Sequence, residues 1–337
     1  MRLEPPGWWH GTSPADRLKA GLLAPAGLLY GTAVKARFAV TKPYRSHLPV
    51  VCVGNFTVGG SGKTPLALAI AKMARGMGHE PAFLTRGYGG ALAGPHRVEA
   101  DRDSAAHVGD EALLLARVAP TVLARHRPDG AKAIEALGVK LIIMDDGFQN
   151  PSLAKDLALI AVDAGAGFGN GQVFPAGPLR APLAHQMERA DAAVLIGDDA
   201  EDIAARLGDW ITILTARMQP AGDVAWLRRQ PILAFSGIGR PDKFFTTLRE
   251  SRAELAGAEP FPDHHAFTQA EALALLKKAA RAGAALVTTE KDWVRISASS
   301  GPLAQLKAMA RPLTVKLTFA NESKNRLLTL LSAVLNG

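Results

Sequence analysis

Cysteine is almost missing from this sequence, which has one, Cys52, among 337 residues. A single cysteine excludes an intramolecular disulfide and any metal site built from several thiolates. Cys52 lies in a valine-rich run, so we expect a small buried core residue rather than a reactive thiol. The first residues also lack the apolar stretch of a secretory signal, and we expect the protein to work in the reducing cytoplasm.

Aromatic residues are scarce as well, at 6% of the chain. The formal net charge of +8 suits a nucleic-acid partner. However, no recognition motif interleaves aromatic with basic residues, so nucleic-acid binding is the weakest of the function classes considered. A hydrophobic content of 48% and a mean hydropathy of +0.07 argue against disorder, and the length allows two domains with cores of their own.

The apolar segment 20–34 is too short for a membrane span, which needs about 20 apolar residues. It lies in the most basic part of the chain, because residues 1–49 carry seven basic side chains against two acidic ones. Trp8 and Trp9 precede it. Two interpretations fit this pattern: an interfacial helix on an anionic membrane, or a core helix that caps the first domain.

What the sequence does contain is a glycine-rich loop, VGNFTVGGSGKTP at 53–65, between a strand pattern at 48–56 and a helical pattern at 62–78. Backbone N–H groups in such a turn, together with the positive end of the helix, bind phosphate. We expect Lys63 to reach the β- and γ-phosphates of ATP and the Thr64 hydroxyl to bind Mg²⁺. The expected ATP-binding residues are Thr57, Val58, Gly59, Gly60, Ser61, Gly62, Lys63 and Thr64.

This loop departs from the usual phosphate-loop pattern at one position. That pattern has glycine where this chain has Thr57. Gly59, Gly60 and Gly62 nevertheless preserve the flexible cradle. We therefore keep the phosphate-binding interpretation.

Short apolar runs alternate with helical patterns along most of the chain, which predicts an α/β fold with a mostly parallel sheet covered on both faces. A second, smaller series begins near Trp226. We predict a membrane-associating segment at 1–47, a phosphate-loop domain at 48–220 and a smaller α/β domain at 221–337. The expected strands after the loop are 81–90, 121–127, 139–149, 157–163, 192–197, 211–216, 231–239, 284–292 and 311–319.

The stretch LIIMDDGFQN at 141–150 is the second strong signal. It places Asp145 at the exit of a buried strand, where phosphate-loop proteins keep a carboxylate for Mg²⁺. Asp146 follows directly, and adjacent side chains at a strand end point in different directions, so the two acids have separate roles. Gln149 is positioned to orient a hydroxyl or a water. The alternative is that the acids cap a turn.

Other polar stretches are ambiguous when each is considered alone. Asp110 opens a helix in GDEALLLA, where capping explains it. His264 in FPDHHAF suits proton transfer or plain surface decoration. Arg86 and Tyr88 in TRGYGG, and Arg180 in FPAGPLRAPL, lie in loops; either arginine suits a phosphate grip or a surface charge.

Taken in order, these stretches, together with FSGIGRP and TTEKDWVRI, resemble the tetraacyldisaccharide 4'-kinase family over nearly the whole chain. That family phosphorylates the 4'-hydroxyl of a lipid disaccharide 1-phosphate in lipid A assembly. The resemblance implies ATP and Mg²⁺ as cofactors, two α/β domains with a cleft, and a peripheral location on the cytoplasmic side of the inner membrane. It also favours the interfacial interpretation of the N-terminal segment.

The resemblance assigns roles residue by residue. It pairs Asp110 with His264 as the group that activates the sugar hydroxyl. It matches Lys63 and Thr64 to phosphate and Mg²⁺. The remaining assignments are Asp145 and Asp146 near the metal, and Arg86, Tyr88, Gln149 and Arg180 toward the substrate.

One position departs from the family pattern. The family usually has glutamate after the arginine of PLR, and this chain has Ala181. A membrane-docked ATPase switch, which hydrolyses ATP without phosphorylating a sugar, is the alternative function.

Overall fold

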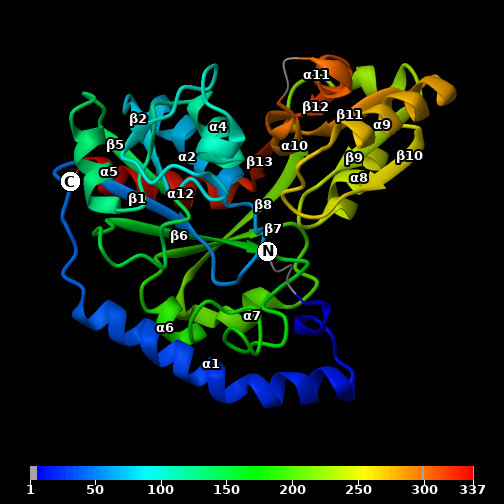
Figure 1. The fold of residues 1–337 in the computed structure, drawn as a ribbon. Helices are drawn as coiled ribbons and strands as arrows, with labels where there is room; N and C mark the ends of the chain where they lie inside the picture. Colours follow the sequence, from blue (N-terminus) through cyan, green and yellow to red (C-terminus); the bar gives the residue numbers. More distant parts are fainter. Residues whose placement is uncertain (1–5, 298–299, 337) are drawn as a thin grey trace.

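The computed structural model describes residues 6–297 and 300–336 (Figure 1). Within these residues, nine strands form a large sheet and four form a smaller one. The large sheet contains β1 (Val50–Gly54), β2 (Pro81–Thr85), β3 (His96–Arg97), β4 (Thr121–Leu123), β5 (Leu141–Asp145), β6 (Leu157–Asp163), β7 (Ala192–Ile196), β8 (Thr212–Pro220) and β13 (Val315–Phe319). The smaller sheet contains β9 (Ile232–Ser236), β10 (Leu255–Pro260), β11 (Ala285–Thr289) and β12 (Arg311–Leu313).

Helices cover both sheets. The α-helices are α1 (Pro14–Val40), α2 (Lys63–Gly76), α3 (Ala105–Val108), α4 (Asp110–Ala116), α5 (Arg127–Glu135), α6 (Leu183–Met187), α7 (Ile203–Leu207), α8 (Pro241–Glu250), α9 (Gln269–Ala282), α10 (Glu290–Arg295), α11 (Gly301–Met309) and α12 (Asn321–Leu335). Short 3₁₀ helices lie at η1 (Gly7–Trp9), η2 (Gly208–Trp210) and η3 (Ala225–Arg228).

The large sheet has the strand order β13-β8-β7-β6-β1-β5-β2-β4-β3. It is parallel except at its edges, where β13 pairs antiparallel with β8 and β3 with β4. Its central strand, β1, reads VVCVG and is buried throughout, as expected for a parallel strand covered on both faces. Cys52 is a fully buried free thiol in this strand, in agreement with the sequence analysis.

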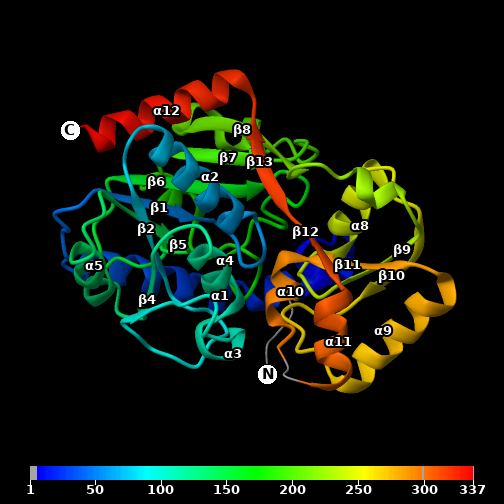
Figure 2. The ribbon, with the colours of Figure 1, turned by 90° about the horizontal axis from the view of Figure 1, so that it is seen from above.

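One face of this sheet is covered by α2, α4 and α12 (Figure 2). Leu66, Ile70 and Ala74 of α2 recur at helical spacing and are fully buried against the strands. Leu327 and Leu331 of α12 join the same core. The opposite face packs against α5, α7 and the loops between β5 and β7.

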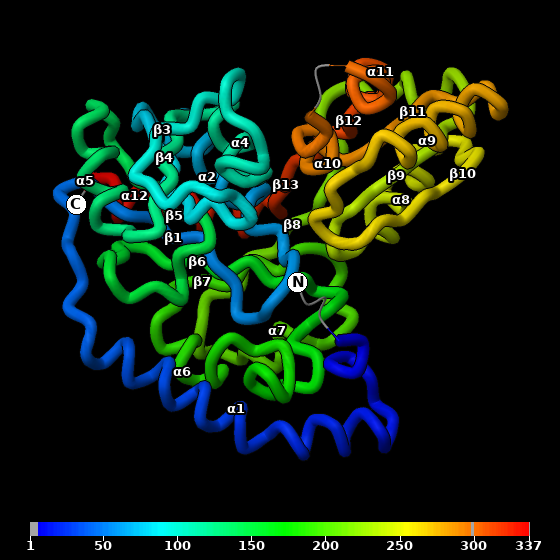
Figure 3. The backbone as a smooth tube through the Cα atoms, in the orientation of Figure 1, coloured from blue at the N-terminus to red at the C-terminus, as the bar shows by residue number. Residues whose placement is uncertain are grey.

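Helix α1 lies along the outside of this second face (Figure 3). Its small residues Gly27 and Gly31 face the protein; a Cβ at Gly27 would lie 2.7 Å from the carbonyl oxygen of Val173. Leu22 and Leu29 fall on the opposite side of the helix and are 74% and 73% exposed. These leucines therefore contribute little to the core, and α1 packs on the protein through its small residues.

The smaller sheet has the order β10-β9-β11-β12, all parallel, and carries its own hydrophobic cores. The chain does not finish there. After β12 it returns to the large sheet through β13, and α12 then packs on β8 and β6. The α/β fold class predicted from the sequence is confirmed, whereas the division into domains near residue 220 stays a prediction.

Several predicted elements differ from the structure. The expected strand 284–292 ends at Thr289, because helix α10 begins at Glu290. The expected strand 311–319 is wrong as a single unit, because β12 and β13 belong to different sheets. The expected strand 121–127 ends at Leu123, since Pro128 in the first turn of α5 starts a helix at Arg127. The helical pattern at 241–255 predicts one helix over this range, but α8 ends at Glu250 and β10 begins at Leu255, where the small residues gave no strand pattern.

We expect Leu66→Ala to lower the free energy of unfolding by about 2–5 kcal/mol, because it leaves a cavity between α2 and the sheet. Leu22→Ala, at an exposed leucine of α1, is the matched control and should change it by less than about 0.5 kcal/mol. Urea denaturation measures both. Equal losses for the two variants would contradict the packing described for these helices.

Candidate active site

The glycine-rich loop joins β1 to α2 at the carboxyl end of the sheet. The side-chain amide of Asn55 donates to the carbonyl oxygens of Thr57 at 2.6 Å and Gly59 at 3.2 Å, which fixes the curvature of the loop from inside. Gly62 has φ 86°, a conformation that favours glycine, and a Cβ there would lie 2.6 Å from Ile196 Cδ1. Glycine at this position is therefore required by both backbone and packing.

A second loop, at 174–183, braces the first. The Val58 N–H donates to the carbonyl oxygen of Pro178 at 2.8 Å, and the Arg180 N–H donates to that of Phe56 at 2.8 Å. The Arg180 guanidinium reaches back to the Thr57 carbonyl oxygen at 3.0 Å. It also donates to Asp146 at 2.8 Å, so one arginine ties the glycine-rich loop to the acid that follows β5.

The two acids after β5 have different surroundings. Asp145 is buried, and its Oδ2 accepts a 3.4 Å hydrogen bond from the Thr64 hydroxyl. Its Oδ1 has no partner among the described residues. Burial, with the charges of Glu111 and Asp146 close by, raises the pKa of Asp145 to about 7.

Asp146 is the more strongly paired acid. Its φ of 50° turns the chain sharply after the strand. Lys63 Nζ lies 4.0 Å from its Oδ1, and Arg180 binds the same oxygen. Burial alone would raise the pKa of Asp146, but the charges of Lys63 and Arg180 hold it well below its ordinary value. The adjacent acids therefore have different surroundings, and their separate roles stay a prediction.

Asp110 and His264 meet across the two sheets. Asp110 is the first residue of α4 and is 3% exposed. His264 follows β10 with φ 58°, held by its N–H donating to the Gly237 carbonyl oxygen at 3.0 Å. Its Nδ1 lies 3.2 Å from Asp110 Oδ2. The Tyr88 ring packs on His264, with centroids 5.4 Å apart. Three polar stretches that were ambiguous in sequence thus converge.

Helix α10 supplies two charged residues at the candidate site that the sequence analysis did not assign. Lys291 Nζ donates to Glu111 Oε1 at 2.6 Å, and Arg295 Nε donates to Asp110 Oδ2 at 2.6 Å. Both lie in TTEKDWVRI, which supported the family resemblance but received no roles. Their spacing of four residues, which places both cations on one face of a helix, was the available signal.

A third missed residue is Arg127, which opens α5 and is 2% exposed. Burial lowers its pKa, while the charge of Asp146 acts in the opposite direction. The charges of Asp146 and Asp145 both act on this buried arginine, which therefore adds positive charge near the two acids. Its sequence context, ARHRP, gave no indication of burial.

The remaining residues that the sequence analysis assigned to the site have varied surroundings. Arg86 and Tyr88 are exposed in the turn after β2. Gln149 donates to Gln186 at 2.5 Å, and Gln186 in turn donates to the carbonyl oxygen of Phe56 at 3.2 Å. Ala181, where the family pattern has glutamate, is fully buried.

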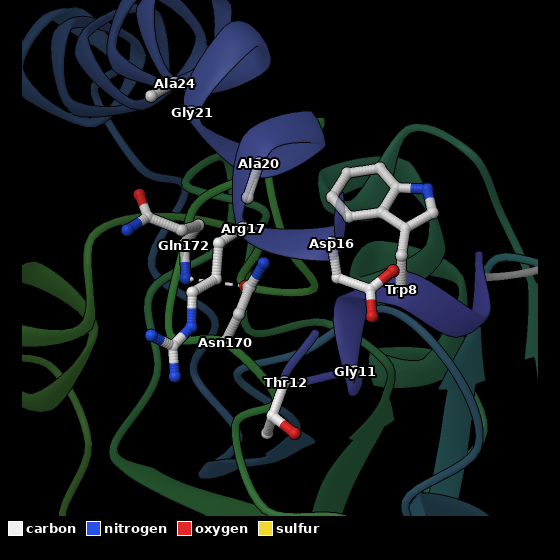
Figure 4. Close-up of a pocket in the computed structure, with 10 residues that line it drawn as sticks. All are labelled: Trp8, Gly11, Thr12, Asp16, Arg17, Ala20, Gly21, Ala24, Asn170 and Gln172. Atoms are coloured by element: carbon white, nitrogen blue, oxygen red, sulfur yellow. Dashed lines mark hydrogen bonds between the residues drawn. The ribbon is translucent and has the colours of Figure 1, made fainter. Parts of the chain in front are cut away.

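A separate cavity of about 380 Å³ lies between α1, residues 8–12 and the loop after β6 (Figure 4). It is lined by Trp8, Gly11, Thr12, Asp16, Arg17, Ala20, Gly21, Ala24, Asn170 and Gln172. None of the predicted site residues lines it.

The fold and these residues define a nucleotide-binding α/β protein of the phosphate-loop type, with a second sheet that contributes side chains to the site. The chain belongs to the tetraacyldisaccharide-1-P 4'-kinase family, whose model matches residues 19–334. The family predicted from the motifs, and with it the kinase class, is confirmed.

Individual relatives agree with this assignment. A tetraacyldisaccharide 4'-kinase of Methylobacterium sp. (strain 4-46) is 50% identical over 98% of this chain and 97% of its own. One from Paramagnetospirillum magneticum is 48% identical over 93% of each. The crystal structure described as the "apo" form of LpxK from Aquifex aeolicus in complex with ATP has a TM-score of 0.75 at 25% identity. It covers 94% of this chain and 99% of that one.

The raised pKa of Asp145 makes the stability of the metal-free, nucleotide-free protein depend on pH. The folded state holds this proton more tightly than the unfolded chain, whose pKa is 3.8. The resulting stability is complete below that value and is lost as the pH rises through about 7. We therefore expect Asp145→Asn to gain several degrees of Tm relative to the unsubstituted protein between pH 4 and pH 8.

Thermal unfolding at several pH values measures this difference. Asp209→Asn, at an exposed aspartate in η2, is the matched control and should follow the unsubstituted protein at every pH. Parallel curves for Asp145→Asn and the unsubstituted protein would contradict the environment described for Asp145.

Proposed function

We propose that this protein transfers the γ-phosphoryl group of ATP to the 4'-hydroxyl of a tetraacyldisaccharide 1-phosphate in lipid A assembly. The observation that carries the proposal is the contact between Asp110 and His264, at 3.2 Å, in a chain of the 4'-kinase family. The charge of Glu111, next to Asp110, acts on Asp145 beside the glycine-rich loop. Phosphoryl transfer requires the proton acceptor and the nucleotide to be held in a fixed relation, and α4 carries Asp110 next to Glu111.

The loop is the proposed nucleotide-binding element. In the loop at 57–62, backbone N–H groups lie at the positive end of α2, except that of Val58, which donates to Pro178; Lys63 begins the helix. Lys63 is 8% exposed and has an acid, Asp146, only 4.0 Å away. Its ammonium group is thus held at the phosphate end of the site, where we assign it to the β- and γ-phosphates of ATP.

The residues present also fit Mg²⁺. No group of three or more His, Cys, Asp or Glu side chains within the described parts of the chain makes a metal site by itself. Mg²⁺ commonly takes one or two carboxylates, with substrate phosphates and waters completing its shell. The unpartnered Oδ1 of buried Asp145, beside the Thr64 hydroxyl, fits that arrangement. Thr64 with Asp145 or Asp146 would hold the ion, which neutralises phosphate charge when bound.

At the acceptor end, Asp110 takes the hydroxyl proton while His264 supports the carboxylate. Burial alone would raise the pKa of Asp110, but the His264 hydrogen bond and the charges of Arg295 and Lys291 hold it well below its ordinary value. The carboxylate is therefore ionised and ready to accept at neutral pH. The hydroxyl oxygen forms the new P–O bond, the bond between the β- and γ-phosphates breaks, and ADP leaves.

Four further residues are proposed to bind the substrate. They are Arg86, Tyr88, Gln149 and Arg180. Tyr88 has the closest support, because its ring packs on His264. Arg180 links the glycine-rich loop to Asp146, so any substrate contact it makes is coupled to the nucleotide end.

Helix α1 is proposed to hold the protein at the cytoplasmic face of the inner membrane. Among the described residues, no helix is both long and apolar enough to cross a bilayer. Leu18, Leu22 and Leu29 form an exposed stripe on α1. Basic residues lie on both flanks of this stripe: Arg17, Lys19, Lys35 and Arg37. Exposed leucines between basic flanks are typical of a helix that lies in an anionic interface.

We expect Asp110→Asn to lower kcat by about 10²–10⁴-fold, because it removes the proton acceptor while leaving the glycine-rich loop intact. The assay follows label from γ-labelled ATP into a lipid disaccharide 1-phosphate. ATP affinity should stay within about threefold, whereas Lys63→Ala, the comparison variant, should weaken both binding and turnover.

Two outcomes would contradict this assignment. Loss of ATP binding in Asp110→Asn would move Asp110 to the nucleotide end of the site. Release of label as inorganic phosphate, with none in the lipid, would favour the ATPase switch over the kinase.

We expect replacement of Leu18, Leu22 and Leu29 by serine to weaken binding to anionic phospholipid vesicles at least about tenfold, because each buried leucine is worth about 1.5–3 kcal/mol. Co-sedimentation measures this binding. Trp210→Ser and Met309→Ser, at exposed apolar residues outside α1, are the controls. Unchanged binding of the triple variant would exclude α1 as the anchor.

A further inference from the structure

We propose that Arg295 is a positioning residue for the transfer step: its guanidinium orients the Asp110 carboxylate, together with His264, so that Oδ1 of Asp110 faces the acceptor hydroxyl. The proposal rests on the proposed function and adds a residue and an atom to it. Both partners are buried, with side-chain exposures of 7% for Arg295 and 3% for Asp110.

The contacts of the carboxylate oxygens distinguish them from each other. Oδ2 of Asp110 accepts from Arg295 Nε at 2.6 Å, and Arg295 Nη2 lies 2.6 Å away. His264 Nδ1 approaches the same oxygen at 3.2 Å. Oδ1 accepts the Glu111 N–H at 2.9 Å. Two side chains therefore occupy Oδ2, and Oδ1 keeps a lone pair for the substrate hydroxyl.

Arg295 is itself fixed from the other side. Its Nη1 donates to Asp292 Oδ1 at 2.8 Å and to the Gly237 carbonyl oxygen at 2.6 Å. Asp292 is fully buried and also accepts from the hydroxyls of Ser236 and Thr289. The guanidinium is thus anchored in the core of the smaller sheet before it reaches Asp110.

The same carbonyl oxygen links Arg295 to His264. Gly237 accepts from Nη1 of Arg295 at 2.6 Å and from the backbone N–H of His264 at 3.0 Å. The two groups that bind Asp110 are therefore held in fixed relation by one peptide group. Arg295 and His264, on the side of the smaller sheet, are therefore fixed relative to each other, and both bind Asp110 on the side of the large sheet.

This arrangement couples the carboxylate to the docking of the two sheets. Asp110 begins α4, while Arg295 ends α10 on the other side of the interface. The Asp110 carboxylate is held in this orientation only while the two sheets are docked, because Arg295 and His264 both come from the smaller sheet's side. Breaking the arginine contact leaves a buried carboxylate with fewer partners, which allows it to rotate away from the acceptor.

A second ion-pair group across the same interface provides a control. Arg240, just before α8, and Lys243 of α8 bind Asp163 at the end of β6, at 2.7 and 2.6 Å. This group holds the two sheets together but does not touch Asp110. A variant of Arg240 therefore separates sheet docking from the orientation of the carboxylate.

The experiment compares Arg295→Met, Arg295→Lys and Arg240→Met in the full chain, with kcat, KM for ATP, KM for the lipid disaccharide 1-phosphate and Tm as readouts. We expect Arg295→Met to lower kcat at least about 30-fold with KM for ATP within about threefold. Arg295→Lys keeps the positive charge but not the planar set of guanidinium donors, so its kcat should lie between those of Arg295→Met and the unsubstituted protein. Arg240→Met should retain kcat within about threefold.

A double-mutant cycle with Asp110→Asn makes the test specific. If Arg295 acts through Asp110, Arg295→Met should lower the residual activity of Asp110→Asn by less than about threefold. Additive losses would overturn the proposal, as would equal losses in Arg295→Met and Arg240→Met. If Arg295→Met lowers Tm strongly, Arg295→Lys replaces it in the double-mutant cycle with Asp110→Asn.

Failure of this proposal is distinguishable from failure of the proposed function. If the unsubstituted protein does not label the lipid, the kinase assignment itself is wrong. If it labels the lipid but the cycle is additive, the kinase stands and Arg295 is only a structural link between the sheets.

Discussion

The parallel pairing of β1 with β5 is the constraint on which the site depends. Val53 is in register with Asp145, so the glycine-rich loop after β1 and the acids after β5 leave the sheet at one edge. Parallel strands end on the same side, and ligands collect there. The Thr64 hydroxyl can reach Asp145 only because this register holds α2 above the end of β5.

The interface between the two sheets brings together the second group of residues on which the proposed chemistry depends. The large sheet contributes Asp110 and the loop, and the smaller sheet contributes His264 and Arg295. Burying charged side chains costs solvation free energy, which their attraction only partly repays. The main contribution of these ion pairs is therefore to orient the side chains rather than to stabilise the fold. The return of β13 and α12 to the large sheet means that two chain crossings connect the sheets, which limits how they can move relative to each other.

The sequence predicted the elements that depend on local patterns. The buried strands β1 and β6 and the helix α2 begin and end within two residues of their expected bounds. The run expected for β5 also included the turns on either side of that strand. The prediction was wrong where the bounds of an element depend on the strands with which it pairs. The run at 311–319 has uniform strand character, and only its pairing with β11 and then with β8 shows that it is two strands.

The sequence by itself predicted the proposed phosphate-binding loop and determined the strand-to-helix turn that carries it, because the glycines, Lys63 and Thr64 are adjacent in the chain. It also determined the family. Only the tertiary structure decided that Arg295 contacts Asp110, 185 positions away. The reason is physical: each of these residues suits a helix end by itself, and their partnership depends on how two separate cores dock.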